Sequence, residues 1–125
     1  MKEAAGVPSV PADTAPPAID ADQRAAVRDS LPPEVVQELL AAFWEDLPAT
    51  RAALDGALLR GDTPTADAAL HTIKGSASSI GYAAVAATAH DARQRLGSDL
   101  AAALHQLDAA LAATAASDPD LPAGS

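Results

Sequence analysis

Residues 64–81 read PTADAALHTIKGSASSIG and decide the fold of this chain. At about 100° per residue, their apolar side chains fall within an arc of roughly 80°, as in a helix that buries one face. These side chains are Ala66, Ala69, Leu70, Ile73, Ala77 and Ile80. His71 lies about 150° from the centre of that arc. The stretch therefore predicts a helix from Pro64 to Ile80, ended by Gly81, with a histidine that faces solvent.

The residues next to His71 indicate that a large partner contacts its ring. Lys74 and Gly75 follow at positions i+3 and i+4, which share a helix face with position i. Lys74 places a positive charge beside the imidazole. Gly75 removes side-chain bulk, although a mid-helix glycine costs about 1 kcal/mol relative to alanine. An anionic group on the ring, with a protein surface pressed against it, explains both features.

The composition favours an all-α protein. Alanine supplies 34 of the 125 residues, aromatic residues make up 2%, and there is no cysteine. Alanine and leucine are good helix formers, whereas strands are rich in β-branched and aromatic residues. Without cysteine the chain has no disulfide framework and no thiolate metal site. This length is most simply one domain.

Proline and glycine positions divide the chain into helices. Besides the histidine helix, we expect helices over residues 22–29, 33–46, 48–59, 83–96 and 98–115. Pro48 should kink or interrupt its helix, while Thr63 and Ser98 are candidate caps. Short connections favour antiparallel neighbours. The predicted fold is an antiparallel four-helix bundle with one or two short extra N-terminal helical segments.

Both ends of the chain are rich in proline and small residues. Such segments bury too little apolar surface to fold alone. We therefore expect a disordered arm or linker over residues 1–20, the bundle over 21–116, and a disordered tail over 117–125.

The segment that begins at His71 resembles the signature of histidine-containing phosphotransfer (HPt) domains of two-component phosphorelays. That signature, His-x-x-Lys-Gly-Ser-small-x-x-aliphatic-Gly, is filled by His71, Lys74, Gly75, Ser76, Ala77, Ile80 and Gly81. The resemblance covers roughly residues 22–116, the size of one domain. It implies that His71 accepts a phosphoryl group, on its distal ring nitrogen, from the aspartyl phosphate of a receiver domain. The group then passes to an aspartate of another receiver.

The resemblance also implies roles for the nearest neighbours of His71. Lys74 would stabilise charge on the phosphoryl oxygens, and Gly75 would leave room for the receiver. The chain would need no cofactor of its own, because the Mg²⁺ required for transfer would belong to the receiver.

Four further residues are supporting candidates. Ser78 either bonds to the phosphoryl oxygens or is a polar surface residue. Asp67 either orients the ring or complements the positive end of the helix. Ser76 is expected to pack or bond locally, and Gly81 to end the helix.

The expected partner surface surrounds His71 and includes the exposed flank of the 33–46 helix. Its candidate contacts are Trp44, Glu45, Gly75 and Ser78. Trp44 either anchors the partner or covers the end of the bundle.

Charge and motifs exclude several classes of function. The net charge is −9 and the pI about 4.4, with no basic patch for nucleic acid. No apolar run approaches the roughly 20 residues of a membrane span, and no signal peptide is apparent. A phosphate-binding loop is also missing. We expect a cytoplasmic, monomeric, bacterial phosphocarrier without ATP-dependent kinase activity of its own. It is either a stand-alone carrier or the C-terminal module of a hybrid sensor histidine kinase.

Two alternatives remain open. One is a non-phosphorylated helical adaptor that binds a receiver or a kinase. The other is a metal-binding bundle using His71, His90 and His105, although their spacing is not that of ligands. The expectation is no metal site, with His90 and His105 as ordinary surface or boundary residues.

One position departs from the family pattern. An acidic residue is common where Arg93 stands, so helix pairing that depends on it is in doubt. We expect Arg93 and Arg95 to form surface ion pairs with Asp91 or Asp99.

Overall fold

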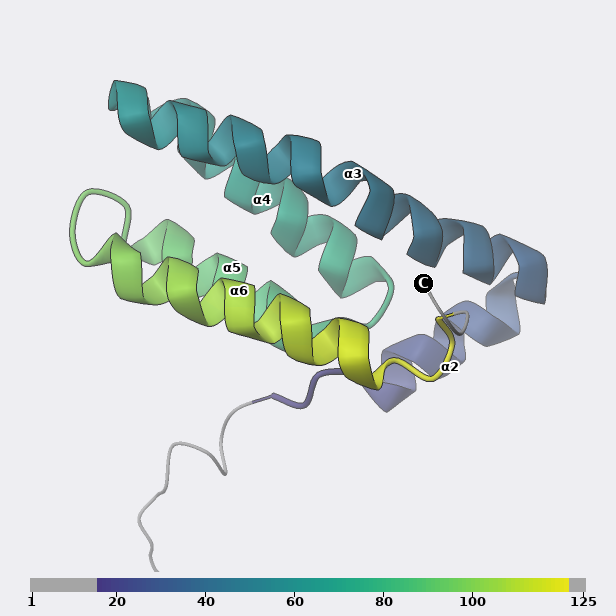
Figure 1. Cartoon of the computed structure of the whole chain (residues 1–125). Helices are drawn as coiled ribbons and strands as arrows, with labels where there is room; N and C mark the ends of the chain where they lie inside the picture. Colours follow the sequence, from purple (N-terminus) through teal and green to yellow (C-terminus); the bar gives the residue numbers. More distant parts are fainter. Residues whose placement is uncertain (1–15, 122–125) are drawn as a thin grey trace, which may run out of the picture.

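The computed structural model describes residues 16–121 and folds them into five helices without a strand (Figure 1). The helices are α2 (Ala21–Ser30), α3 (Pro33–Arg60), α4 (Thr63–Ser79), α5 (Ala83–Gln94) and α6 (Leu100–Ser117). Helix α4 packs between α3 and α5, and α5 packs between α4 and α6. Short turns make successive helices of this bundle antiparallel. The predicted all-α bundle is confirmed. None of these five helices is long and apolar enough to cross a membrane.

The apolar arc predicted for the histidine helix is buried as a whole. All six of its side chains are at most 8% exposed. They meet leucines of α3 and α6 and small residues of α5, so that the helices approach closely. Complete burial of one leucine, such as Leu70, contributes about 1.5–3 kcal/mol. The rotation of α4 about its own axis is fixed by this face.

Helix α3 continues through Pro48, where the sequence predicted a kink or a new helix. A mid-helix proline costs about 3 kcal/mol. The two halves of α3 are nevertheless buried in the same core, through Leu40 and Phe43 before the proline and Leu54 and Ala57 after it. Packing on both sides holds the helix together. A new helix starting at Pro48, one of the two predicted outcomes, was therefore wrong.

Two helix caps also differ from the prediction. Asp62, rather than Thr63, caps α4, because its carboxylate accepts a hydrogen bond from the backbone N–H of Thr65 at 3.2 Å. This bond lowers the pKa of Asp62. Ser98 does not cap α6; its hydroxyl donates to the carbonyl of Arg95 at 3.1 Å, within the preceding turn.

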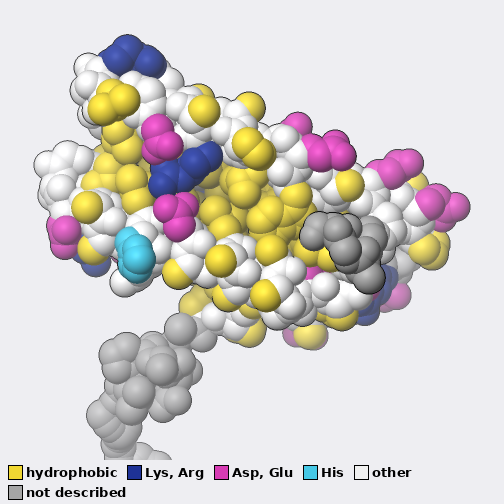
Figure 2. All heavy atoms as spheres, viewed as in Figure 1, with side chains coloured by type: hydrophobic (Ala, Val, Ile, Leu, Met, Phe, Trp, Pro, Cys, Tyr) yellow, Lys and Arg dark blue, Asp and Glu magenta, His cyan; other side chains and the backbone are white. Residues whose placement is uncertain are grey.

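Helices α3 and α6 close the bundle on the face shown in Figure 2. Hydrophobic side chains gather between the two helices there. Half-buried leucines of both helices pack against the core. Arg51 of α3 reaches Asp108 of α6, with Nη2 3.0 Å from Oδ2. This ion pair is partly exposed, so it contributes little to stability compared with the apolar contacts.

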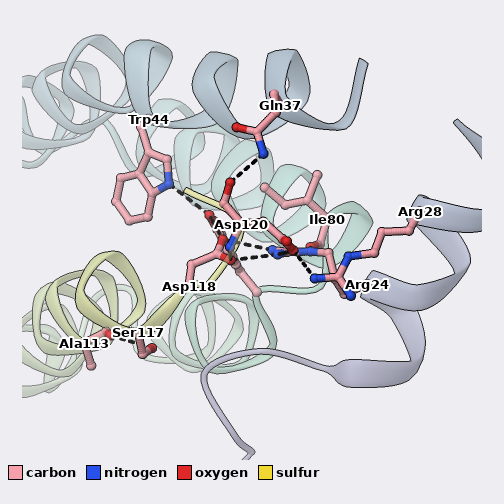
Figure 3. A network of polar contacts seen from close by, with 10 residues as sticks. Arg24, Arg28, Gln37, Trp44, Ile80, Ala113, Ser117, Asp118 and Asp120 are labelled. Atoms are coloured by element: carbon pink, nitrogen blue, oxygen red, sulfur yellow. Dashed lines mark hydrogen bonds and ion pairs between the residues drawn. The ribbon is translucent and has the colours of Figure 1, made fainter. Parts of the chain in front are cut away.

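Helix α2 and the segment after α6 meet at one end of the bundle and close it (Figure 3). Arg24 of α2 is 2% exposed and donates to both carboxylate oxygens of Asp118, at 2.8 and 3.1 Å. It also donates to Asp120 at 2.7 Å. The buried hydroxyl of Tyr82 donates to Asp118 at 2.7 Å and accepts from the indole of Trp44 at 2.9 Å. One polar network therefore joins α2, α3, the α4–α5 turn and the C-terminal segment.

The packed part of the chain extends beyond the boundary predicted at residue 116. Helix α6 runs through Ser117, and Asp118 is 7% exposed. A disordered tail from residue 117 was predicted because the segment is rich in proline and small residues. Nothing in that composition indicated that the Asp118 carboxylate neutralises a buried arginine on α2. The predicted arm is also too long, because Asp20 caps α2 with its side chain and Ile19 packs against the core. Residues 1–15 and 122–125 of the predicted arm and tail lie outside the described residues.

Gly81 seats α2 against the turn that ends α4. Its φ is 86°, a left-handed conformation that favours glycine. A Cβ at this position would lie 3.2 Å from the backbone oxygen of Asp20 and 3.3 Å from the backbone nitrogen of Arg24. The backbone N–H of Asp20 donates to the Gly81 carbonyl at 2.7 Å. Glycine is required here both for the turn and for the close approach.

We expect Gly81→Ala to destabilise the fold more than Gly97→Ala does. Gly97 has the same left-handed conformation, with φ 85°, but nothing lies within 4 Å of its Cβ position. Both changes carry the conformational cost of roughly 1–2 kcal/mol. Only Gly81→Ala also pushes α2 away. Urea unfolding of the two variants measures the difference, and equal losses would contradict the proposed seating of α2.

We further expect Asp118→Asn to reduce stability in a pH-dependent way. Burial alone would raise the pKa of Asp118, but the bonds from Arg24 and Tyr82 outweigh it and hold the pKa below its usual value. Such a carboxylate stabilises the fold above its unfolded pKa of about 3.9, and the contribution is lost as pH falls through the folded value.

At neutral pH the variant's free energy of unfolding should be lower by roughly 3 kcal/mol, because among the described residues Arg24 keeps only Asp120 as an acidic partner. The difference in free energy of unfolding between variant and wild type should become smaller below about pH 4. Urea unfolding at both pH values tests this. A gap that stays constant across the range would mean that the Asp118 carboxylate is not the titrating partner.

Candidate functional site

His71 stands on the outer side of α4, away from the buried arc. His71 is exposed, whereas Leu70 and Ile73 on the same helix are at most 2% exposed. The exposed position predicted by the helical wheel is therefore present in the structure. The imidazole is open to a partner on this side of the bundle.

Arg93 of α5 contacts the ring of His71. Its Nη1 lies 3.1 Å from Nδ1 of the histidine. The other guanidinium nitrogens of Arg93 are held by Asp67, with Nε 2.8 Å from Oδ1 and Nη2 3.2 Å from Oδ2. The bond from Arg93 keeps the pKa of Asp67 below its usual value. Asp67 thus reaches His71 through the arginine.

This pairing corrects one prediction. Arg93 was expected to pair with Asp91 or Asp99 and instead crosses to α4. Arg95 does contact both of those carboxylates, at 3.0 and 3.5 Å. The reason is rotational: two residues along a helix turn a side chain by about 200°, so Arg93 and Arg95 leave α5 in opposite directions.

Lys74 contacts a second histidine of α5. Its Nζ lies 3.2 Å from Nδ1 of His90. His90 is therefore part of the surroundings of the site, where the sequence placed only an ordinary surface or boundary residue. An ammonium group has three donors. Two remain for an anionic group on the neighbouring His71.

The surface next to His71 is open at Gly75. No heavy atom of the described part of the chain lies within 4 Å of a Cβ built on this glycine. Ser76 and Ser78 are both exposed, and the Ser76 carbonyl accepts a hydrogen bond from Ser79 at 2.8 Å. The glycine therefore serves no packing purpose within the bundle, and the space beside it is available to another molecule.

A groove of about 470 Å³ runs between α3 and α4 on the other flank of the histidine helix. Leu39, Leu47 and Thr50 line it from α3, and Thr72 and Ser76 line it from α4. Leu39 is 40% exposed. The inward positions of its helix are Val36, Leu40 and Phe43, so Leu39 falls on the rim. The groove thus offers apolar surface close to the site.

Trp44 lies at the end of the bundle, where it is half-buried. Its ring meets Phe43 edge-on at 5.1 Å between centroids, and its N–H is donated to Tyr82. These contacts fit the covering role that the sequence left open. Glu45, the next residue, is exposed.

The histidines do not assemble a metal site. Among residues 16–121, no three His, Cys, Asp or Glu side chains come together in a way that could hold an ion. His105 stands exposed on α6, while His71 and His90 each contact a cationic side chain.

The family model described as Hpt domain matches residues 38–117, well over half of the chain. The protein belongs to the Hpt domain family. Its class of function is histidine-containing phosphotransfer in two-component relays, in which Hpt domains carry phosphoryl groups to and from receiver domains. No match was found among curated proteins or among solved structures. Helix α2 and the segment that holds Asp118 and Asp120 lie outside the matched part of this Hpt domain protein.

The two α5 residues at the site, Arg93 and His90, were not predicted from the sequence. A signal was nevertheless present. In two antiparallel helices joined by a short turn, residues about equally far from the turn lie opposite each other. Counted from Gly81, His71 and Lys74 precede the turn by nearly the same intervals at which Arg93 and His90 follow it. The counting gives neighbours across the helices but not which side chains bond.

We expect Gly75→Leu to block transfer while the bundle stays folded. Position 75 is open, and leucine is a better helix former than glycine by up to about 1 kcal/mol. The melting temperature should be unchanged or higher. Phosphoryl transfer from a receiver should fall on the order of 100-fold, because the partner can no longer reach the ring.

Ala101→Leu, on the exposed side of α6, is the matched control for added bulk. It should transfer at the wild-type rate. Comparable rates in Gly75→Leu and wild type would remove Gly75 from the docking surface.

Proposed function

We propose that this protein is a phosphorelay intermediate in which His71 accepts a phosphoryl group from a receiver aspartyl phosphate and passes it to another receiver aspartate. The single observation that carries this proposal is an exposed imidazole beside an open backbone at Gly75. It supports phosphotransfer because in-line attack needs a nucleophile that a second active site can enclose.

The chemistry needs little from the chain itself. A ring nitrogen of His71 attacks phosphorus while the bond from phosphorus to the aspartate oxygen breaks and the carboxylate leaves. Charge is spread over the equatorial phosphoryl oxygens during this step. Lys74, whose ammonium lies on the same helix face, is placed to stabilise that charge. Mg²⁺ is proposed to arrive with the receiver.

The receiver is proposed to dock over α3 and α4. Gly75 and Ser78 lie next to His71, and the groove with Leu39 on its rim adds apolar area. Glu45 would lie at the edge of this surface. Because the chain carries a net charge of −9 and the receiver site is acidic, overall electrostatics oppose approach. Apolar contact and Lys74 must therefore supply the attraction.

The broader context follows from the same reading. We propose a cytoplasmic phosphocarrier with no ATP-dependent kinase activity of its own, acting alone or as the C-terminal module of a hybrid sensor histidine kinase. A non-phosphorylated adaptor would use the same docking surface, so only the chemistry at His71 separates the two functions.

We expect His71→Gln to abolish transfer completely. The test incubates wild type and variant with a phosphorylated receiver and measures acid-labile, base-stable phosphate on the chain. His105→Gln, a change of the same kind at an exposed position of α6, is the control and should be labelled like wild type. Labelling of His71→Gln would defeat the assignment. A protein that binds receivers but is never labelled would be an adaptor.

A further inference from the structure

The contact between Arg93 and His71 constrains where the ring can carry a proton. A guanidinium group has only donors and does not lose its charge in proteins. With Nη1 of Arg93 3.1 Å from Nδ1 of His71, the contact is a hydrogen bond only if Nδ1 presents its lone pair. A proton on Nδ1 would place two donors against each other. Arg93 therefore selects the unprotonated state of Nδ1.

We propose that Arg93 is a positioning residue that keeps Nδ1 of phosphorylated His71 unprotonated and so slows the loss of the phosphoryl group. This inference rests on the proposed function, since it concerns the phosphorylated form of the same ring. It also places the phosphoryl group on Nε2, because Nδ1 faces the arginine and Nε2 is the other ring nitrogen.

The position of Arg93 is set by Asp67. Two bonds of 2.8 and 3.2 Å fix Nε and Nη2 of the arginine on the carboxylate. Such two-point contact orients the guanidinium plane. The remaining Nη1 then points at His71. Asp67 is a second positioning residue, one turn before the histidine, that acts through the arginine.

The bond changes in phosphoryl loss explain the effect. An oxygen of the acceptor, a receiver carboxylate or water, forms a bond to phosphorus as the bond between phosphorus and Nε2 breaks. The electron pair of that bond returns to the ring. If Nδ1 carries a proton, the ring leaves as neutral imidazole. If Nδ1 has none, the ring leaves as an anion, or a proton must reach it during the step.

Arg93 therefore opposes the form of the ring that leaves most easily. A carboxylate in its place would accept a bond from a protonated Nδ1 and act in the opposite direction. In the accepting direction, attack requires a lone pair on Nε2, so the neutral ring must first release Arg93 and carry its proton on Nδ1. That proton departs to water once the bond between Nε2 and phosphorus has formed. The bond from Arg93 can then form. The arrangement favours a long-lived phosphorylated state over rapid release.

The charged and titratable groups near the ring come from α4 and α5. Asp67 and Lys74 come from α4 itself, and Arg93 and His90 come from α5. Helix α3 contributes Asp46 to the groove on the opposite flank of α4. Of these, only Arg93 bonds to the His71 ring among the described residues.

The test follows phosphate loss from the full chain after chemical labelling with phosphoramidate, which requires no receiver. ³¹P spectra give the rate of loss from about pH 5 to 9, the range over which histidine changes charge. Arg93→Gln should lose phosphate about 3- to 10-fold faster near neutral pH. As the pH is lowered, the rate of loss should begin to increase at a higher pH in this variant than in wild type. Asp67→Asn should also raise the rate of phosphate loss and the pH at which that rate begins to increase, but by less than Arg93→Gln does.

Arg95→Gln is the matched control, because within residues 16–121 the ion pairs of Arg95 are with Asp91 and Asp99 and none is with His71. It should behave as wild type. A second readout needs no phosphate: the ¹⁵N shift of Nδ1 in the unmodified protein should move toward the protonated value in Arg93→Gln. If Arg93→Gln does not fold, Asp67→Asn carries the test.

Wild-type rates and unchanged ¹⁵N shifts in Arg93→Gln, or in Asp67→Asn where it stands in, would overturn the proposal. That failure is separate from failure of the proposed function. The function fails if receivers do not label His71, whatever the proton distribution on its ring.

Discussion

The burial of one face of α4 is the constraint on which the rest of the structure depends. This helix lies between α3 and α5, and its six apolar side chains are at most 8% exposed. Rotating it would expose Leu70 and Ile73, each worth about 1.5–3 kcal/mol of burial, and would bury Lys74. The cost of Gly75, about 1 kcal/mol, is small by comparison. The core can therefore hold an exposed histidine and an open backbone in place.

A second constraint acts at the end of the bundle. The α4–α5 turn, α2 and the segment after α6 meet around the buried pair of Arg24 and Asp118 (Figure 3). Burying two charges is expensive, so the pair adds little net stability over apolar residues, whereas loss of either partner would leave an uncompensated buried charge. Tyr82 and Gly81 complete the arrangement, the first by hydrogen bonding and the second by its left-handed backbone. Helix α2 and the segment after α6 lie outside residues 38–117, the part that matches the Hpt model, whereas Gly81 and Tyr82 lie inside it.

The electrostatics of the site differ from those of the chain. The protein carries a net charge of −9, yet both histidines between α4 and α5 face a cation. Lys74 and Arg93 gather positive charge where an anionic phosphoryl group is proposed to sit. Asp67 offsets part of that charge and orients the arginine. The two contacts differ in kind, since the arginine acts on the ring of His71 itself while the lysine keeps free donors.

Helical period and signature spacing were enough to predict most of the helices and the exposed face of the histidine, because both are properties of one segment. Packing between helices settles that α3 passes through Pro48, that Asp118 neutralises Arg24, and that Arg93 bonds to His71. Each of these depends on the rotation and register of helices packed against one another. A periodic pattern says which side of a helix is buried. It does not say which residue of a neighbouring helix lies opposite, because that is set by contacts between segments far apart in the chain.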